Sequence, residues 1–261
     1  MLLILKLTLT PLVVTIATLV ARRFGTRAGG VVTGLPLTAG PVSIFLAAEH
    51  GVAFASDAAI AMLLSLISIA GFACGYRLSA ARLGWPGGVA TGFVAHMTLT
   101  ALLSGLSVNL PEAVALSGLV VLLALGLVGG RGRASAASQA TKSWELPLRI
   151  VVATTLVLVI TMTAEAIGPR VAGLLTTLPI IASVIIVTAH RAGGPAEAFV
   201  AVRGHLLGTL SLGAFFAVVA LLLAVAGPVL AYAAAIATAI GVNRLLMWRE
   251  RPRPQKALPA A

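Results

Sequence analysis

Long apolar stretches that are nearly free of charge recur along the whole chain. Each is long enough to cross about 30 Å of hydrocarbon as a helix. Together they leave 59% of the 261 residues hydrophobic and only 10% charged. We therefore expect an all-α polytopic membrane protein, because a membrane-spanning segment must satisfy its backbone hydrogen bonds internally. The stretches predict nine transmembrane helices, at residues 3–21, 29–48, 57–76, 88–107, 113–129, 148–166, 171–189, 205–226 and 228–247.

The net charge of +11 is best explained by membrane topology. If the N-terminus lies outside, all basic residues except Lys6 and Arg170 fall in the inner loops and the C-terminal tail. Basic residues are retained on the cytoplasmic side of a membrane. We expect an integral protein of a bacterial inner membrane, with its N-terminus outside and its C-terminus cytoplasmic. The lipid bilayer is then its main partner, and no nucleic acid is expected to bind.

The second half of the chain repeats the first at an offset of 143 residues. The segment GTRAGGVVTGLP at 25–36 aligns with GPRVAGLLTTLP at 168–179, with matches at glycine, arginine, threonine, leucine and proline. Gly51 and Gly194 continue the register downstream. Such matches are not interchangeable apolar filler, so we interpret the two halves as copies of one four-helix unit.

The repeat divides the chain into four parts. These are a first repeat at 1–110, a connecting span and cytoplasmic linker at 111–145, a second repeat at 146–250 and a basic cytoplasmic tail at 251–261. Because one connecting helix separates the copies, the second enters the membrane from the opposite face. Inverted repeats with interrupted helices are the plan of many secondary transporters.

A proline breaks the second and the seventh predicted helix at matching positions. Proline lacks an N–H and crowds the preceding turn, so Pro179 is expected to free the carbonyl of Leu175. Such carbonyls are tolerated in a membrane only against protein, a hydroxyl or water. We therefore predict that the two breaks face each other near the bilayer midplane and bind substrate; the alternative is a pair of simple kinks. The predicted binding residues are Thr33, Leu35, Pro36, Thr38, Thr176, Thr177, Leu178, Pro179 and Ser183.

Few ionisable residues fall inside the predicted helices. His96 lies near the centre of the fourth and is a candidate for proton coupling, the alternative being a neutral histidine bonded to a backbone carbonyl. Arg27 and Arg170 occupy matching positions and are expected to bind lipid headgroups or to line a vestibule for an anionic solute. The single cysteine, Cys74, excludes an internal disulfide and a cysteine-built metal site. No metal or cofactor is expected.

These features predict a secondary transporter, either a permease or an exporter, for a small organic or anionic solute. Access would alternate around the midplane site between the two broken helices, with proton coupling as one form of the cycle. Enzyme motifs such as HExxH, the P-loop and GxSxG are missing from the sequence, so no enzyme is expected. A flippase-like lipid-handling protein and a structural or assembly subunit stay open as alternatives, and so does a homo-oligomer.

Overall fold

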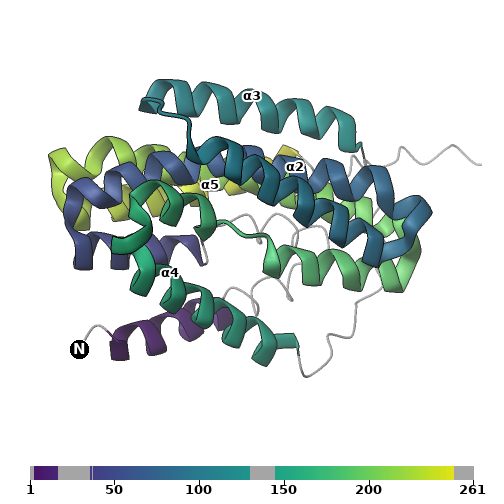
Figure 1. Cartoon of the computed structure of the whole chain (residues 1–261), viewed down its shortest axis with the longest axis horizontal. Coiled ribbons are helices and arrows are strands. Elements are labelled where there is room, and N and C mark those ends of the chain that lie inside the picture. The colour runs from purple at the N-terminus through teal and green to yellow at the C-terminus, as the bar shows by residue number, and fades with distance from the viewer. Residues whose placement is uncertain (1–2, 17–35, 37, 130–144, 250–261) are drawn as a thin grey trace, which may run out of the picture.

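In the computed structural model of this chain, every regular element of the described residues is a helix (Figure 1). The structure describes residues 3–16, 36, 38–129 and 145–249. Within them, an N-terminal helix (Leu3–Ile16) is followed by α2 (Ala39–Ser104), α3 (Leu110–Val128), α4 (Glu145–Thr176) and α5 (Ile180–Arg249). Three stretches are long and apolar enough to cross a membrane: Ala39–Ser104, Leu110–Val128 and Leu146–Arg249. The prediction of an all-α protein with long apolar helices is confirmed.

Glycine corners interrupt α2, α4 and α5. The glycines at these corners have φ between 66° and 87° and an extended ψ, a combination that is essentially restricted to glycine. In four of the five, a proline follows within two residues and starts the next helical segment. Each corner therefore ends one straight helix and begins another inside a single labelled element. The five glycines are Gly51, Gly84, Gly168, Gly194 and Gly227.

The first long element, α2, lies at the centre of the bundle. It contacts α3, α4 and α5. Of its most apolar stretch of 18 residues, 72% is buried, compared with 33% for α3. Figure 1 shows α3 along one side of the α2–α5 layer, with α4 and the N-terminal helix on the opposite side. The outer face of α3 carries exposed leucines, as a lipid-facing helix should. They include Leu119, Leu122, Leu123 and Leu127.

The helix α3 runs from one end of the bundle to the other. Its 19 residues span about 28 Å, close to the thickness of a hydrocarbon core. Asn109 and Glu112 form a capping box at its first turn. At its last turn, Arg77 Nε donates to the carbonyl of Val128 at 3.1 Å, and Arg203 donates to carbonyls of the same turn. We call these the Asn109 end and the Arg77 end.

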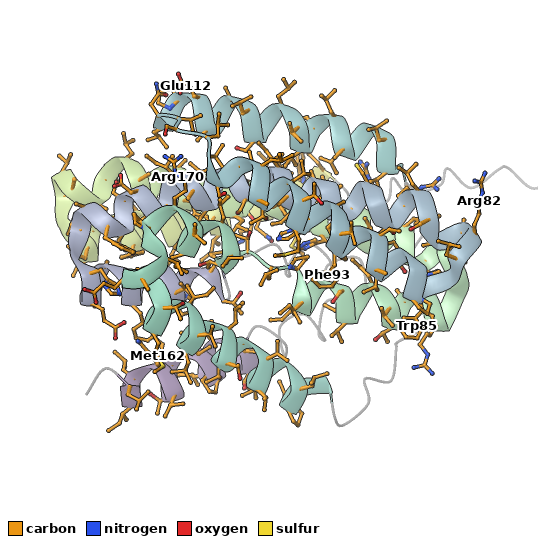
Figure 2. The ribbon with its side chains drawn as sticks, in the orientation of Figure 1. Arg82, Trp85, Phe93, Glu112, Met162 and Arg170 are labelled. Carbon is orange, nitrogen blue, oxygen red and sulfur yellow. The ribbon has the colours of Figure 1, made fainter. Side chains whose placement is uncertain are left out.

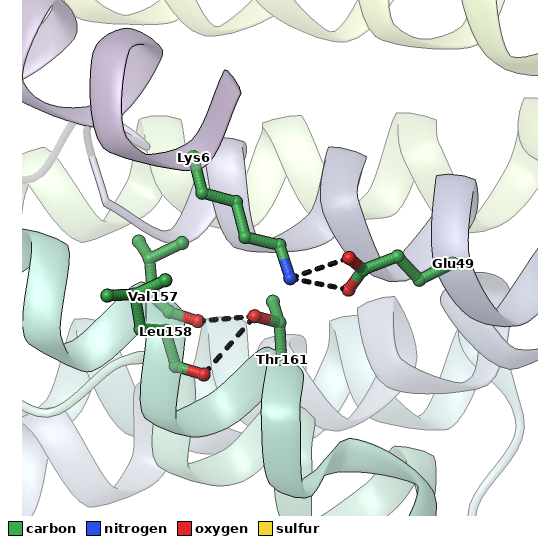
Figure 3. A network of polar contacts seen from close by, with 5 residues as sticks. All are labelled: Lys6, Glu49, Val157, Leu158 and Thr161. Carbon is green, nitrogen blue, oxygen red and sulfur yellow. Dashed lines mark hydrogen bonds and ion pairs between the residues drawn. The ribbon is translucent and has the colours of Figure 1, made fainter. Parts of the chain in front are cut away.

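An ion pair between the buried Lys6 and the more exposed Glu49 attaches the N-terminal helix to α2 (Figure 3). Lys6 Nζ lies 2.6 Å from Glu49 Oε1 and donates to Oε2 at 2.7 Å, and Lys6 is only 5% exposed. Next to it, the Thr161 hydroxyl donates to the Val157 carbonyl of its own helix at 2.8 Å. Because the ammonium group is removed from water, the carboxylate is what keeps its burial favourable.

Candidate functional site

The break predicted at Pro179 is a complete interruption between two helices. The helix α4 ends at Thr176 and α5 begins at Ile180. In the connecting turn, the Leu178 N–H donates to the Leu175 carbonyl at 3.3 Å. The expectation that Pro179 leaves the Leu175 carbonyl free is therefore wrong, because the chain turns tightly enough for a nearer N–H to reach it.

The break predicted at Pro36 lies at the start of α2. Pro36 precedes the helix, and its carbonyl accepts from the Gly40 N–H at 2.9 Å. Thr38 is the N-cap residue, but its side chain makes no capping hydrogen bond. Of the other residues predicted here, Thr33, Leu35 and Arg27 lie outside the described residues.

A small cavity of about 50 Å³ lies between the two breaks. We call it the break cavity. It is bounded by the start of α2, the end of α4 and the start of α5, and by residues deeper in the same helices: Ile69, Val152, Ala153, Leu156, His205 and Leu212. Five of the predicted binding residues line it, namely Thr38, Thr176, Thr177, Leu178 and Pro179. Pro36 and Ser183 do not line it, and the Ser183 hydroxyl instead donates to the Ile180 carbonyl at 2.7 Å.

Two helix N-termini meet at the break cavity. Thr38 and Ala39 bring the start of α2 to its wall, and Ile180, Ile181 and Ala182 bring the start of α5. First-turn N–H groups have no partner inside their own helix and carry the positive end of the helix dipole. Within the described residues, the N–H groups of Ile181 and Ala182 have no backbone acceptor. Such a wall favours the negative charge of a bound ligand.

Two of the three threonine hydroxyls at the cavity, those of Thr176 and Thr177, donate to their own helix. Thr176 Oγ1 donates to the Ala172 carbonyl at 2.7 Å, and Thr177 Oγ1 donates to the Leu174 carbonyl at 3.3 Å. These bonds are the ones expected of a simple kink. They leave only the hydroxyl lone pairs to face a ligand, so backbone N–H groups are the donors that the break itself supplies.

A second histidine, His205, lines the break cavity and was missed in the sequence. The predicted eighth helix begins at His205, which placed this residue at a membrane surface. In the structure the helical segment begins near Pro195, because Arg203 is accommodated within it by its bonds to α3. His205 is therefore buried well inside the segment. A more generous allowance for arginine near a helix end could have found it.

His96 is completely buried on α2, with an exposed fraction of 0%. The backbone of Ser68 lies close to it, yet within the described residues neither ring nitrogen makes a hydrogen bond of ordinary geometry. His96 also interacts electrostatically with His205. The structure thus brings the histidine predicted for proton coupling close to one that lines the break cavity, although His96 itself does not line it.

Arg170 lies at the Asn109 end, as Figure 2 shows beside Glu112, while Arg82 and Trp85 lie at the opposite end. Its guanidinium donates to the Ser107 hydroxyl at 3.2 Å. Arg170 lines a second cavity, of about 200 Å³, together with Asp57. We call this the Asp57–Arg170 cavity.

No family model, curated protein or solved structure matches the chain. In the part of the chain that the structure describes, no group of three or more histidine, cysteine or acidic residues is placed to hold a metal ion. The chemistry available at the two cavities is therefore that of helix N-termini, histidine, arginine and aspartate.

Proposed function

We propose that the protein is a secondary transporter that binds the anionic group of a small organic solute in the break cavity. The observation that carries the proposal is the meeting of two helix N-termini, those of α2 and α5, at one internal cavity beside His205. In secondary transporters, discontinuous helices point their N-termini at anionic groups near the bilayer midplane. Within the described residues, the break also divides the segment between the corners at Gly168 and Gly194 into two helical parts.

Matching glycine corners support a repeat in the backbone. Gly51 and Gly194 have φ of 87° and 73°, and Gly84 and Gly227 have φ of 66° and 77°. Both pairs have the offset of 143 residues that relates Pro36 to Pro179. A residue in this conformation is rare outside glycine, so two coincidences at the same spacing favour duplication over chance.

Two contacts support inversion of the repeat. Arg77 lies 4.1 Å from the ring centroid of Phe199, and Ser56 Oγ donates to the Ala220 carbonyl at 3.3 Å. At the repeat offset, Ser56 corresponds to Phe199 and Arg77 to Ala220, so each contact is the image of the other. Reciprocal contacts of this kind are those of a two-fold axis. The matched segments also run in opposite directions. The segment of α2 runs from Ser56, next to Asp57, to Arg77 at the opposite end of the bundle. The matching segment of α5 begins beside Arg77 with Phe199 and ends beside Ser56 with Ala220.

On this proposal the glycine corners divide α2, α4 and α5 into seven spans, and the N-terminal helix and α3 bring the number in the described chain to nine. With the N-terminal helix and α3, the spans of the described chain are the segments 38–50, 52–83, 85–104, 145–167, 169–192, 195–226 and 228–249. The Arg77 end then faces the cytoplasm, because Arg77, Arg82 and Arg203 gather there. Labelling with a membrane-impermeant maleimide tests this orientation: in a Cys74→Ser background of intact cells, Glu112→Cys should react and Arg82→Cys should not.

Transport requires the break cavity to enlarge. Its volume of about 50 Å³ has room for water but not for an organic solute. The starts of α2 and α5 must therefore move apart when a solute binds. In an inverted repeat, such a movement on one side has a symmetry-related counterpart on the other, which provides alternating access.

The N–H groups at the start of α5 provide a direct test. Ile181→Pro removes one donor at a helix position where proline is tolerated, and Ile181→Val keeps the donor and serves as the control. Because a hydrogen bond to a charged group contributes about 1.5–3 kcal/mol, we expect Ile181→Pro to weaken solute affinity by about 10-fold to 100-fold. Uptake of labelled leucine, lactate and succinate into proteoliposomes is the measurement. Equal uptake by both variants, or none above empty vesicles for the wild type, would rule out the proposed site.

Proton coupling through His96 is part of the same proposal. Histidine can take up and release a proton, and His96 lies near His205, which lines the cavity. We expect His96→Gln to flatten the dependence of the initial transport rate on pH, while the rate at the optimal pH falls less. A pH profile that keeps its shape in both His96→Gln and His205→Gln would remove this pair from the coupling mechanism.

A further inference from the structure

The Asp57–Arg170 cavity is lined by one acidic and one basic residue. It has a volume of about 200 Å³ and lies at the Asn109 end between α2, the start of the last α4 segment and the loop before α3. Asp57 and Arg170 are the charged residues of its lining. The remaining lining is apolar and includes Ile60, Leu64, Leu106 and Val108.

The two charges are held apart on different helices. Arg170 has five N–H donors, and one of its terminal nitrogens bonds the Ser107 hydroxyl at 3.2 Å. Asp57 is exposed and makes no ion pair with Arg170, although both line the same cavity. Donors of the guanidinium and both carboxylate oxygens therefore remain available to a molecule between them.

A ligand with a single charge does not match this cavity. An anion placed against Arg170 leaves Asp57 with reduced hydration and no partner, and a cation placed against Asp57 does the same to Arg170. A molecule with a carboxylate and an ammonium satisfies both, and the guanidinium favours a carboxylate because it can donate two parallel bonds. The apolar wall adds a place for a hydrocarbon side chain.

One short helix extends from the wall of this cavity to the wall of the break cavity. This helix follows Gly168, begins with Pro169 and Arg170 at the Asp57–Arg170 cavity, and ends at Thr176 in the wall of the break cavity. At about 1.5 Å per residue, the two cavities lie about 10 Å apart along it.

We propose that the Asp57–Arg170 cavity binds a zwitterion with an apolar side chain, of the chemistry of a neutral aliphatic α-amino acid. Arg170 binds the carboxylate, Asp57 binds the ammonium, and the apolar wall contacts the side chain. As a statement about the transported solute, this rests on the proposed function. As a statement about binding, it concerns this cavity alone.

Three ligands with the same isobutyl group test the proposal: leucine, 4-methylpentanoate without the amino group, and isopentylamine without the carboxylate. Isothermal titration calorimetry of the purified full chain in nanodiscs should give leucine an affinity at least 10-fold higher than either analogue. Asp57→Asn should abolish the preference for leucine over 4-methylpentanoate, and Arg170→Gln the preference over isopentylamine. Glu165→Gln is the matched control, because it removes an exposed acidic residue that does not line the cavity.

Equal affinities for the three ligands, or preferences that survive both variants, would overturn the proposal. Glycerophosphoethanolamine carries the same pair of charges in a lipid headgroup and forms a further arm. If it binds with this dependence on Asp57 and Arg170 while leucine does not, the site belongs to a lipid headgroup and the amino acid assignment fails. Leucine binding here with no effect of Ile181→Pro on transport would instead refute only the proposed function of the break cavity.

Discussion

The closest packing of α4 on α2 occurs at Gly173, and this contact yields a quantitative prediction. A Cβ atom at Gly173 would lie 2.4 Å from the carbonyl oxygen of Ala58 and 2.8 Å from Cβ of Ala61. The nearer atom belongs to the backbone of α2, so it cannot turn aside as a side chain can. Gly173→Ala therefore requires the short helix between Arg170 and Thr176 to move away from α2.

The size of the effect follows from two opposing contributions. Overpacking of a close contact costs about 1–3 kcal/mol. Replacing glycine by alanine inside a helix contributes about 0.5–1 kcal/mol in the opposite direction. We expect Gly173→Ala to lower the free energy of unfolding by about 1–2 kcal/mol. In Gly118→Ala, the control on α3, nothing lies within 4 Å of the added carbon, so only the stabilising contribution remains.

The assay is reversible unfolding of the purified protein in mixed micelles of dodecyl maltoside and sodium dodecyl sulfate, followed by tryptophan fluorescence. Opposite signs for the two alanine variants are the expected result. A Gly173→Ala protein as stable as Gly118→Ala would refute the close approach of α4 to α2. Because Gly173 is three residues from Arg170, the same variant should also weaken leucine binding at the Asp57–Arg170 cavity.

Two further predictions use the same unfolding assay. Glu49→Gln leaves the buried ammonium of Lys6 without its counter-charge and should cost about 1–3 kcal/mol, less than a fully buried pair would because Glu49 is partly hydrated, whereas adding Lys6→Met should restore most of the loss; a single variant of wild-type stability would contradict the pairing of Lys6 with Glu49. Gly227→Ala places a side chain on a left-handed backbone and should cost about 1–2 kcal/mol. Its control, Gly126→Ala, lies in a regular helix with nothing within 4 Å and should be neutral or stabilising.

Features that depend on local chemistry could be predicted from the sequence. Apolar length identified the long helices, and Pro179 was correctly expected to interrupt one, because the missing N–H acts within a few residues. Thr38, Thr176 and Thr177 line one cavity, whereas the placement of the two breaks at the bilayer midplane stays a prediction.

Features that depend on tertiary packing could not be predicted in this way. No sequence pattern links Glu49 to Lys6, 43 residues away, yet the two residues form an ion pair. Asp57 and Arg170 have no sequence pattern that brings them together, and only the packing of α4 on α2 places them in one cavity. His205 was overlooked because the predicted eighth helix begins only after Arg203. In the structure the helix includes Arg203, whose guanidinium donates to carbonyls at the end of α3.

Under the proposed two-fold relation, the glycine corners of the two copies match but several of their polar side chains do not. At the repeat offset, Asp57 corresponds to Val200, His96 to Ala239 and His205 to Met62. Each of these polar groups is therefore present in one copy only. A symmetric backbone allows two openings of similar energy related by the two-fold axis, and groups found in a single copy then make the two openings chemically different. On this reasoning the Asp57–Arg170 pair has no counterpart in the other copy, because Arg27 occupies the position that matches Arg170 but Val200 stands in place of the aspartate.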